Sequence, residues 1–112
     1  IQKATAVMSS HIPVYMVVNL TVQDAAAYRN YERGFFAILK RYGGEFLTFD
    51  DAHITLEGSK PPSGRMIIFK FPSKEQATSW YADPEYQTLS EFRRQGTQLE
   101  YLTLLHGLPA RA

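Results

Sequence analysis

Three polar residues around one loop form the first candidate for a reactive site. Glu57 and Arg65 flank the glycine- and proline-rich segment 58–64, and His53 precedes Glu57 by four residues. A carboxylate beside a guanidinium can bind a small polar or anionic substrate, and a histidine beside a carboxylate can act as a base. We therefore take His53, Glu57 and Arg65 as candidate catalytic residues. The alternative is a structural ion pair between Glu57 and Arg65, with His53 a solvated strand residue.

Four aromatic residues form the second candidate, a ligand-binding pocket. Tyr28, Trp80, Tyr81 and Tyr86 combine flat apolar rings with hydroxyl or indole N–H groups, which suits the binding of a planar molecule. The alternative for this set is core packing between helix and sheet. Helical spacing favours that alternative for Trp80, whereas Tyr28, Tyr81 and Tyr86 are better placed to keep a polar tip at a cavity.

The sequence carries no sign of a metal or cofactor site. The chain has no cysteine, and its three histidines, His11, His53 and His106, lack the short spacing of metal ligands. It also has no phosphate-binding glycine loop, nucleophile elbow or dinucleotide fingerprint. We expect neither a metal nor a cofactor.

Composition narrows the possible partners. The net charge is +1 over 112 residues without a run of like charge, so a nucleic-acid partner is not expected. No apolar stretch approaches the ~20 residues that cross a bilayer, so neither a membrane partner nor a signal peptide is expected. A chain without cysteine fits a cytoplasmic location.

The pattern along the chain predicts strands alternating with helices. Asp24 should cap a first helix that Gly43 ends. Ser73 and the pair Asp83-Pro84 should start the two parts of a broken second helix that ends at Gly96. The predicted strands are 13–20, 45–49, 53–57, 65–71 and 99–106, in which 45–49 and 53–57 are two paired strands or one bent ribbon.

This order, βαββαβ, predicts a ferredoxin-like α+β fold with both helices on one face of an antiparallel sheet. Met16, Val18, Met66 and Ile68 are expected on the other face, which is too apolar for water. A second copy of the chain would cover it, so we expect a homodimer. Residues 13–108 should form one domain, and residues 1–12 a flexible segment or a cloning remnant.

Several short motifs are similar to those of one uncharacterised family. They are Asp24 with Tyr28 and Tyr31, Tyr42–Leu47, Leu56–Gly58, Arg65 with Ile67–Phe71, Pro72-Ser73, Trp80-Tyr81 and Pro84–Tyr86. On these motifs, from about Val14 to Gly107, the chain resembles the family named domain of unknown function 1330. The resemblance implies a dimeric α+β barrel but no activity. The chain has Ala25 where that family often has proline.

Two functions follow as hypotheses. In the first, the protein binds a small organic molecule between helix and sheet and catalyses a cofactor-independent oxidation or isomerisation. In the second, it is a non-catalytic binding or assembly domain whose polar pairs are structural. Asn19 fits the pattern of the haem-degrading enzymes that use this barrel, but Trp80 falls on a predicted helix and no histidine follows it nearby, so that match is poor. The strand 65–71 lacks the glycine and ring pattern of an RNA-recognition domain.

Overall fold

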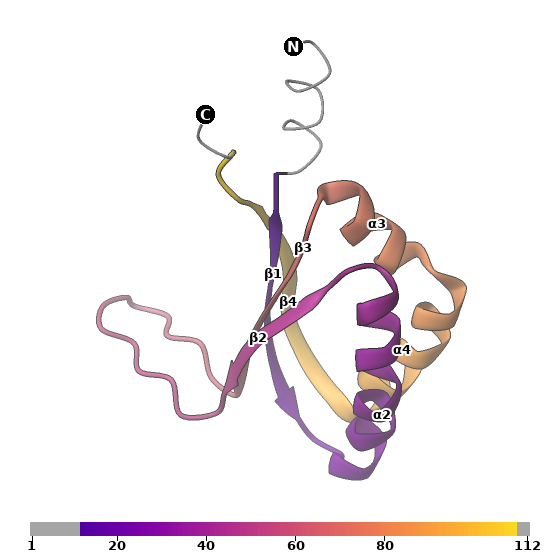
Figure 1. Cartoon of the computed structure of the whole chain (residues 1–112). Helices are drawn as coiled ribbons and strands as arrows, with labels where there is room; N and C mark the ends of the chain where they lie inside the picture. The colour runs from indigo at the N-terminus through magenta and orange to yellow at the C-terminus, as the bar shows by residue number, and fades with distance from the viewer. Residues whose placement is uncertain (1–11, 110–112) are drawn as a thin grey trace.

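The computed structural model describes residues 12–109 (Figure 1). Four strands and three helices follow one another in this part of the chain. Their bounds are β1 Val14–Val22, α2 Ala25–Arg41, β2 Glu45–Asp50, β3 Arg65–Phe71, α3 Lys74–Ala82, α4 Pro84–Gly96 and β4 Thr97–His106.

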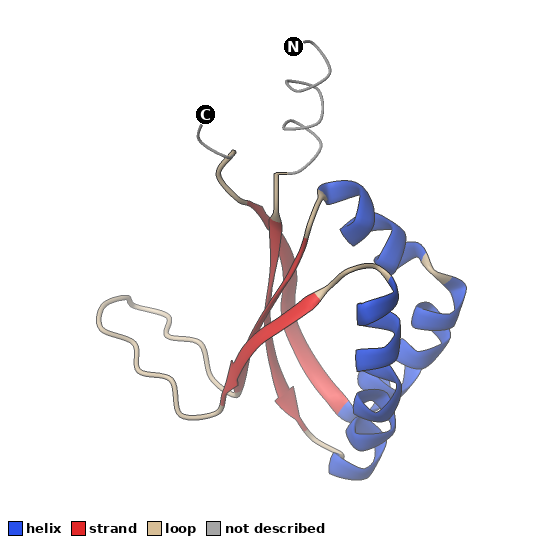
Figure 2. Cartoon of the chain, viewed as in Figure 1, coloured by secondary structure: helices blue, strands red, loops and turns tan. Residues whose placement is uncertain are grey.

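The strands form one antiparallel sheet in the order β2-β3-β1-β4. The two central strands, β1 and β3, are thus separated in sequence by α2 and β2, while α3 and α4 connect β3 to the outer strand β4. All three helices cover the same face of the sheet (Figure 2). The predicted α+β ferredoxin-like topology is confirmed, with the second helix divided into α3 and α4.

Local signals set the helix ends as expected. The Asp24 carboxylate accepts hydrogen bonds from the backbone N–H groups of Ala26 and Ala27 at the start of α2. Ser73 caps α3 through the N–H of Gln76, and Asp83 caps α4 immediately before Pro84. Gly43 adopts a φ of +74° just beyond α2, a conformation that costs glycine little.

The face of the sheet that packs on the helices is apolar and rich in aromatic rings. Met16 pairs with Phe69 and Val18 with Ile67 across the β1–β3 ladder, and all four side chains are buried. Residues directly opposite each other in a ladder point to the same face. The prediction that Met16 and Val18 lie on the open face was therefore wrong.

The open face carries the alternate residues of each strand. Tyr15 and Val17 pair with Lys70 and Ile68, and Asn19 pairs with Met66. Met66 and Ile68 therefore lie where the sequence predicted. The error at β1 arose because both of its faces are apolar, so hydrophobicity alone cannot distinguish the two registers.

The predicted strand 53–57 is also wrong. Residues 51–64 form an extended loop that projects from the end of β2 and returns to β3 (Figure 1). Ile54 and Leu56, which were expected on one face of a strand, are 82% and 89% exposed. The segment does not pair with β2, the edge strand expected to be its partner, and an alternating pattern by itself does not supply the backbone hydrogen bonds that a strand needs.

Within the described residues, none of the helices has the length and apolar character that crossing a membrane requires.

Candidate functional site

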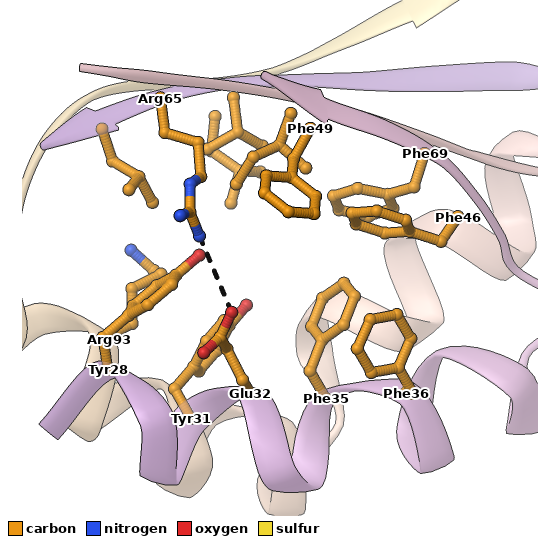
Figure 3. A pocket seen from close by; sticks show the side chains of 14 residues that line it. Tyr28, Tyr31, Glu32, Phe35, Phe36, Phe46, Phe49, Arg65, Phe69 and Arg93 are labelled. Carbon is orange, nitrogen blue, oxygen red and sulfur yellow. Dashed lines mark ion pairs between the residues drawn. The ribbon is translucent and has the colours of Figure 1, made fainter. Parts of the chain in front are cut away.

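A cavity of about 80 Å³ lies between α2 and the sheet. Figure 3 shows it from close by, with side chains rising from α2 toward those that descend from β2 and β3. Its lining is mostly aromatic and aliphatic, with two arginines and one glutamate. The lining residues are Val18, Leu20, Tyr28, Tyr31, Glu32, Phe35, Phe36, Phe46, Phe49, Arg65, Ile67, Phe69, Arg93 and Leu102.

Phenylalanine rings from the helix and the sheet meet at one end of the cavity. Phe35 packs edge-to-face on both Phe46 and Phe69, at centroid distances of 6.2 and 5.4 Å. Phe36 packs on Phe46 in the same manner at 5.3 Å. Phe36 and Phe49 remain 52% and 53% exposed, so the aromatic lining continues outward to solvent. Such a lining suits a flat apolar ligand.

Arg65 holds the polar side of this cavity. Its Nε and Nη2 atoms donate to the two carboxylate oxygens of Asp51 at 2.7 and 2.9 Å, and Nη1 lies 3.7 Å from Glu32 Oε2. Its guanidinium also lies 4.6 Å from the Phe49 ring centroid and 5.8 Å from that of Tyr28. Arg65 therefore joins the sheet, the projecting loop and α2.

The charges around Arg65 shift the pKa values of its neighbours. Hydrogen bonds from Arg65 lower the pKa of the Asp51 carboxyl, and Asp51 in turn raises the pKa of the guanidinium. Burial raises the pKa of the Tyr28 phenol, an effect that the positive charge of Arg65 partly offsets. Tyr28 is thus a neutral hydroxyl at the cavity at ordinary pH.

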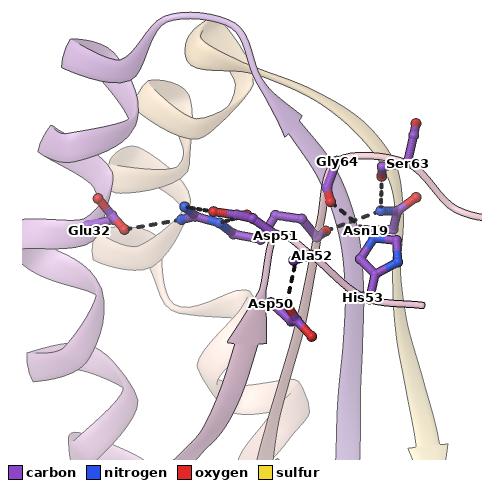
Figure 4. A network of polar contacts seen from close by, with 9 residues as sticks. Asn19, Glu32, Asp50, Asp51, Ala52, His53, Ser63 and Gly64 are labelled. Carbon is purple, nitrogen blue, oxygen red and sulfur yellow. Dashed lines mark hydrogen bonds and ion pairs between the residues drawn. The ribbon is translucent and has the colours of Figure 1, made fainter.

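Polar contacts hold the backbone that carries Arg65 (Figure 4). The side-chain amide of Asn19, on β1, donates to the carbonyl oxygens of Ser63 and Arg65 at 2.6 and 3.1 Å. His53 Nε2 lies 3.1 Å from the carbonyl oxygen of Gly64. Gly64 has a φ of +75°, and a Cβ there would lie 2.4 Å from the Leu20 carbonyl oxygen. Only glycine fits this turn.

The candidate catalytic residues occupy different places. Arg65 lines the cavity. Glu57 is exposed in the loop 51–64, and the described ion pairs of Arg65 are with Asp51 and Glu32 instead. His53 sits at the base of the same loop, against the backbone. Neither His53 nor Glu57 is among the residues that line the cavity.

The candidate ligand-binding aromatics separate in the same way. Tyr28 lines the cavity. Trp80 and Tyr86 are fully buried, with ring centroids 4.2 Å apart, and belong to the core behind it. The Tyr86 hydroxyl is 2.7 Å from that of Tyr31, which does line the cavity. Tyr81 is exposed and borders a second cavity between α3, α4 and the sheet.

Sequence reasoning missed several lining residues. Four of them were not among the predicted site residues: Glu32 and Phe36 on α2, Phe49 on β2 and Arg93 on α4. A usable signal was present for Arg93, because it continues the buried spacing of Tyr86 and Leu89 rather than the exposed face. Among the described residues, no group of three His, Asp or Glu side chains could hold a metal ion.

The fold is α+β and ferredoxin-like, with one four-stranded antiparallel sheet and three helices. A family model described as Domain of unknown function (DUF1330) matches residues 13–108, and the chain belongs to this family. A search of curated proteins gives no significant match.

Solved structures share the fold at low sequence identity. A protein of unknown function from Rhodopseudomonas palustris is 20% identical, with a TM-score of 0.66 over 100% of this chain and 95% of that one. The cofactor-independent oxygenase SnoaB from Streptomyces nogalater is 18% identical, with a TM-score of 0.60 over 90% and 95%. A candidate antibiotic-biosynthesis monooxygenase from Chloroflexus aurantiacus is 14% identical, with a TM-score of 0.50 over 88% and 97%.

Proposed function

We propose that this protein binds a small planar organic molecule in the cavity between α2 and the sheet. The observation that carries the proposal is the lining itself, in which phenylalanine rings from both layers lead to a guanidinium and a carboxylate at one side. Ligand sites combine such an apolar surface with a few polar groups that fix orientation. The half-exposed rings of Phe36 and Phe49 provide the way in.

The chemistry proposed for this site is proton abstraction from carbon without a cofactor. The Glu32 carboxylate would accept a proton from a carbon next to a carbonyl group, and the positive charges of the two lining arginines, Arg65 and Arg93, would stabilise the enolate that forms. Return of the proton to another carbon is an isomerisation, whereas reaction of the enolate with dioxygen is an oxidation. The shared fold of SnoaB, a cofactor-independent oxygenase, supports the oxidation. Because His53 and Glu57 lie outside the lining, the proposal gives proton transfer to Glu32.

The functional unit in this proposal is a homodimer. The open face of the sheet presents Val17, Met66 and Ile68 without covering helices, and Tyr101 and Leu105 on β4 add exposed apolar surface. A second sheet packed on this face would bury that surface, as the superfamily arrangement implies.

One observation favours the second hypothesis, a non-catalytic binding or assembly domain. Arg65 is already engaged by Asp51 through a bidentate pair at Nε and Nη2, and by Glu32 at Nη1. A guanidinium satisfied in this way can serve as a clasp that fixes the projecting loop to α2 rather than as a substrate-binding group.

A thermal-shift screen with aromatic ketones, phenols and quinones tests the proposal. A ligand that binds only the folded protein, at ~100 times its dissociation constant, adds about 2.7 kcal/mol of stability. We expect hits in the wild type and in the control Arg33→Met, an exposed residue on α2, and loss of those hits in Phe35→Ala. For a hit that carries an acidic C–H group, Glu32→Gln should abolish turnover while binding remains. Absence of any hit in the folded wild type would overturn the proposal in favour of an assembly role.

A further inference from the structure

Arg93 is a buried arginine at the meeting point of two cavities. It lies on α4, is only 3% exposed, and lines the cavity between α2 and the sheet. With Leu102 it also lines a second cavity of about 460 Å³, which is bordered by Met16, Ala77, Thr78, Tyr81, Leu99 and Leu104. Its guanidinium is therefore withdrawn from bulk water but has open space beside it.

The described residues leave this guanidinium without an anionic partner. Arg93 takes part in none of the ion pairs among residues 12–109, and its buried Nε has no hydrogen-bond acceptor. Its one described side-chain interaction of polar character is with the Tyr31 ring, whose centroid lies 5.7 Å from Cζ. Residues 1–11 and 110–112 contain no Asp or Glu that could supply a carboxylate side chain.

An unpaired buried charge is strongly unfavourable. A guanidinium remains protonated in proteins, so it cannot escape the cost of burial by losing its proton. The interaction with one aromatic face offsets only part of that cost. A bound anion would supply the missing hydrogen bonds. The space for it lies in the cavity between α2 and the sheet, which Arg93 lines.

The two arginines of this cavity differ in what they can still bind. Arg65 donates hydrogen bonds from Nε and Nη2 to Asp51, and its Nη1 forms an ion pair with Glu32, so two carboxylates already balance its charge. Arg93 has no ion pair among the described residues, and its Nε–H has no acceptor. We infer that the ligand of this cavity carries an anionic oxygen, a carboxylate, enolate or phenolate on a planar ring, and that Arg93 binds that oxygen.

This inference rests on the proposed function of the cavity and deepens it by naming the class of ligand. A cavity of about 80 Å³ is smaller than the ~150 Å³ that encloses a whole benzene ring. We therefore expect the anionic group to lie inside beside Arg93, and the ring to extend outward between Phe36 and Phe49. A neutral amide of the same shape would leave Arg93 unpaired and should bind less well.

A titration with benzoate and with its neutral counterpart benzamide tests the inference. The variants are Arg93→Met, which removes the buried charge, and Arg94→Met, a matched control on the same helix. Arg94 is exposed and bonded to Glu91 and Gln87. By NMR titration, benzoate should bind the wild type and Arg94→Met at least tenfold more tightly than benzamide does. Arg93→Met should lose that preference.

A measurement on the wild type keeps the test valid if Arg93→Met does not fold. The side-chain Nε–H resonance of Arg93, identified by its absence in Arg93→Lys, should shift on addition of benzoate and not of benzamide. Equal binding of both probes, with this resonance unmoved, would overturn the inference while leaving the cavity a ligand site. Failure of both probes and of the wider thermal-shift screen would overturn the inference together with the proposed function.

Discussion

Arg65 and Arg93 line one cavity, the first from the sheet and the second from the helix layer, but their surroundings differ. Arg65 is partly exposed and paired with two carboxylates, on a backbone that Asn19 and Gly64 hold in place. Arg93 is buried, with a ring face beside it and no carboxylate. The comparison shows that proximity to a cavity does not make two like charges equivalent, because each binds a ligand only with the donors its neighbours leave available.

Among the changes that test this comparison, a substitution in the backbone next to Arg65 should alter the free energy of unfolding most. Gly64→Ala places a Cβ 2.4 Å from the Leu20 carbonyl oxygen at a φ of +75°, so it should lower the free energy of unfolding by about 3 kcal/mol. Urea unfolding measures the change. The control Ser63→Ala leaves the accepting carbonyl in place and should alter stability little. A Gly64→Ala protein as stable as the wild type would show that the turn is not tightly held.

Removal of the buried charge of Arg93 should have the next largest effect on the free energy of unfolding, and it should raise it. Arg93→Met keeps an apolar stem of similar length and removes an unpaired cation, so the unliganded protein should gain about 1 to 2 kcal/mol. For a domain of this size, this raises the melting temperature by several degrees. A loss of stability of similar size would show instead that a group outside the described residues, such as one from a second copy, pairs with Arg93.

The pair Arg65–Asp51 should contribute less to the free energy of unfolding than Gly64→Ala or Arg93→Met changes it. A double-mutant cycle with Arg65→Ala and Asp51→Ala should give a coupling free energy of about 1 kcal/mol, because the pair is bidentate but largely solvated. The pair Arg94–Glu91, three residues apart on α4, provides a reference of about 0.3 kcal/mol. Equal couplings for the two pairs would contradict the special role given to Arg65.

The smallest expected effect is on the pH dependence of stability. Hydrogen bonds from Arg65 lower the pKa of Asp51 in the folded protein, so this group adds stability above its unfolded pKa near 4. That contribution is lost as the pH falls through the lower, folded pKa. The stability difference between the wild type and Asp51→Asn should therefore shrink by a few tenths of a kcal/mol below about pH 4. A difference that grows on acidification would contradict this sign.

Elements whose signals are local could be predicted from the sequence. The caps Asp24, Ser73 and Asp83 satisfy free N–H groups within three residues, so their effect needs no distant partner. The β3 strand was predicted with its observed bounds, because Pro72 ends it and its alternation is strong. The segment 53–57 has a similar alternation, but the strand predicted there was wrong, because alternation alone does not make a segment pair with an edge of the sheet.

The residues of the candidate site also differ in whether a local signal in the sequence could reveal them. Arg65 and Tyr28 could be found because each stands at a recognisable element end or helix face. Glu32 and Asp51, the partners of Arg65, are separated from it by 33 and 14 positions. Glu32 reaches it because α2 packs on the sheet, and Asp51 because β2 pairs with β3. No spacing rule connects residues on three different elements.

The sequence by itself determined the order of elements, the helix ends and the ferredoxin-like topology, because caps, periodicity and connection rules act over a few residues or limit the ways strands can pair. Only the tertiary structure decided which face of β1 is buried, where the loop 51–64 goes, and which arginine lacks a partner. Each of these features depends on which distant segments lie beside a residue, because the neighbours determine whether a polar or charged group is buried and whether it has a hydrogen-bond partner.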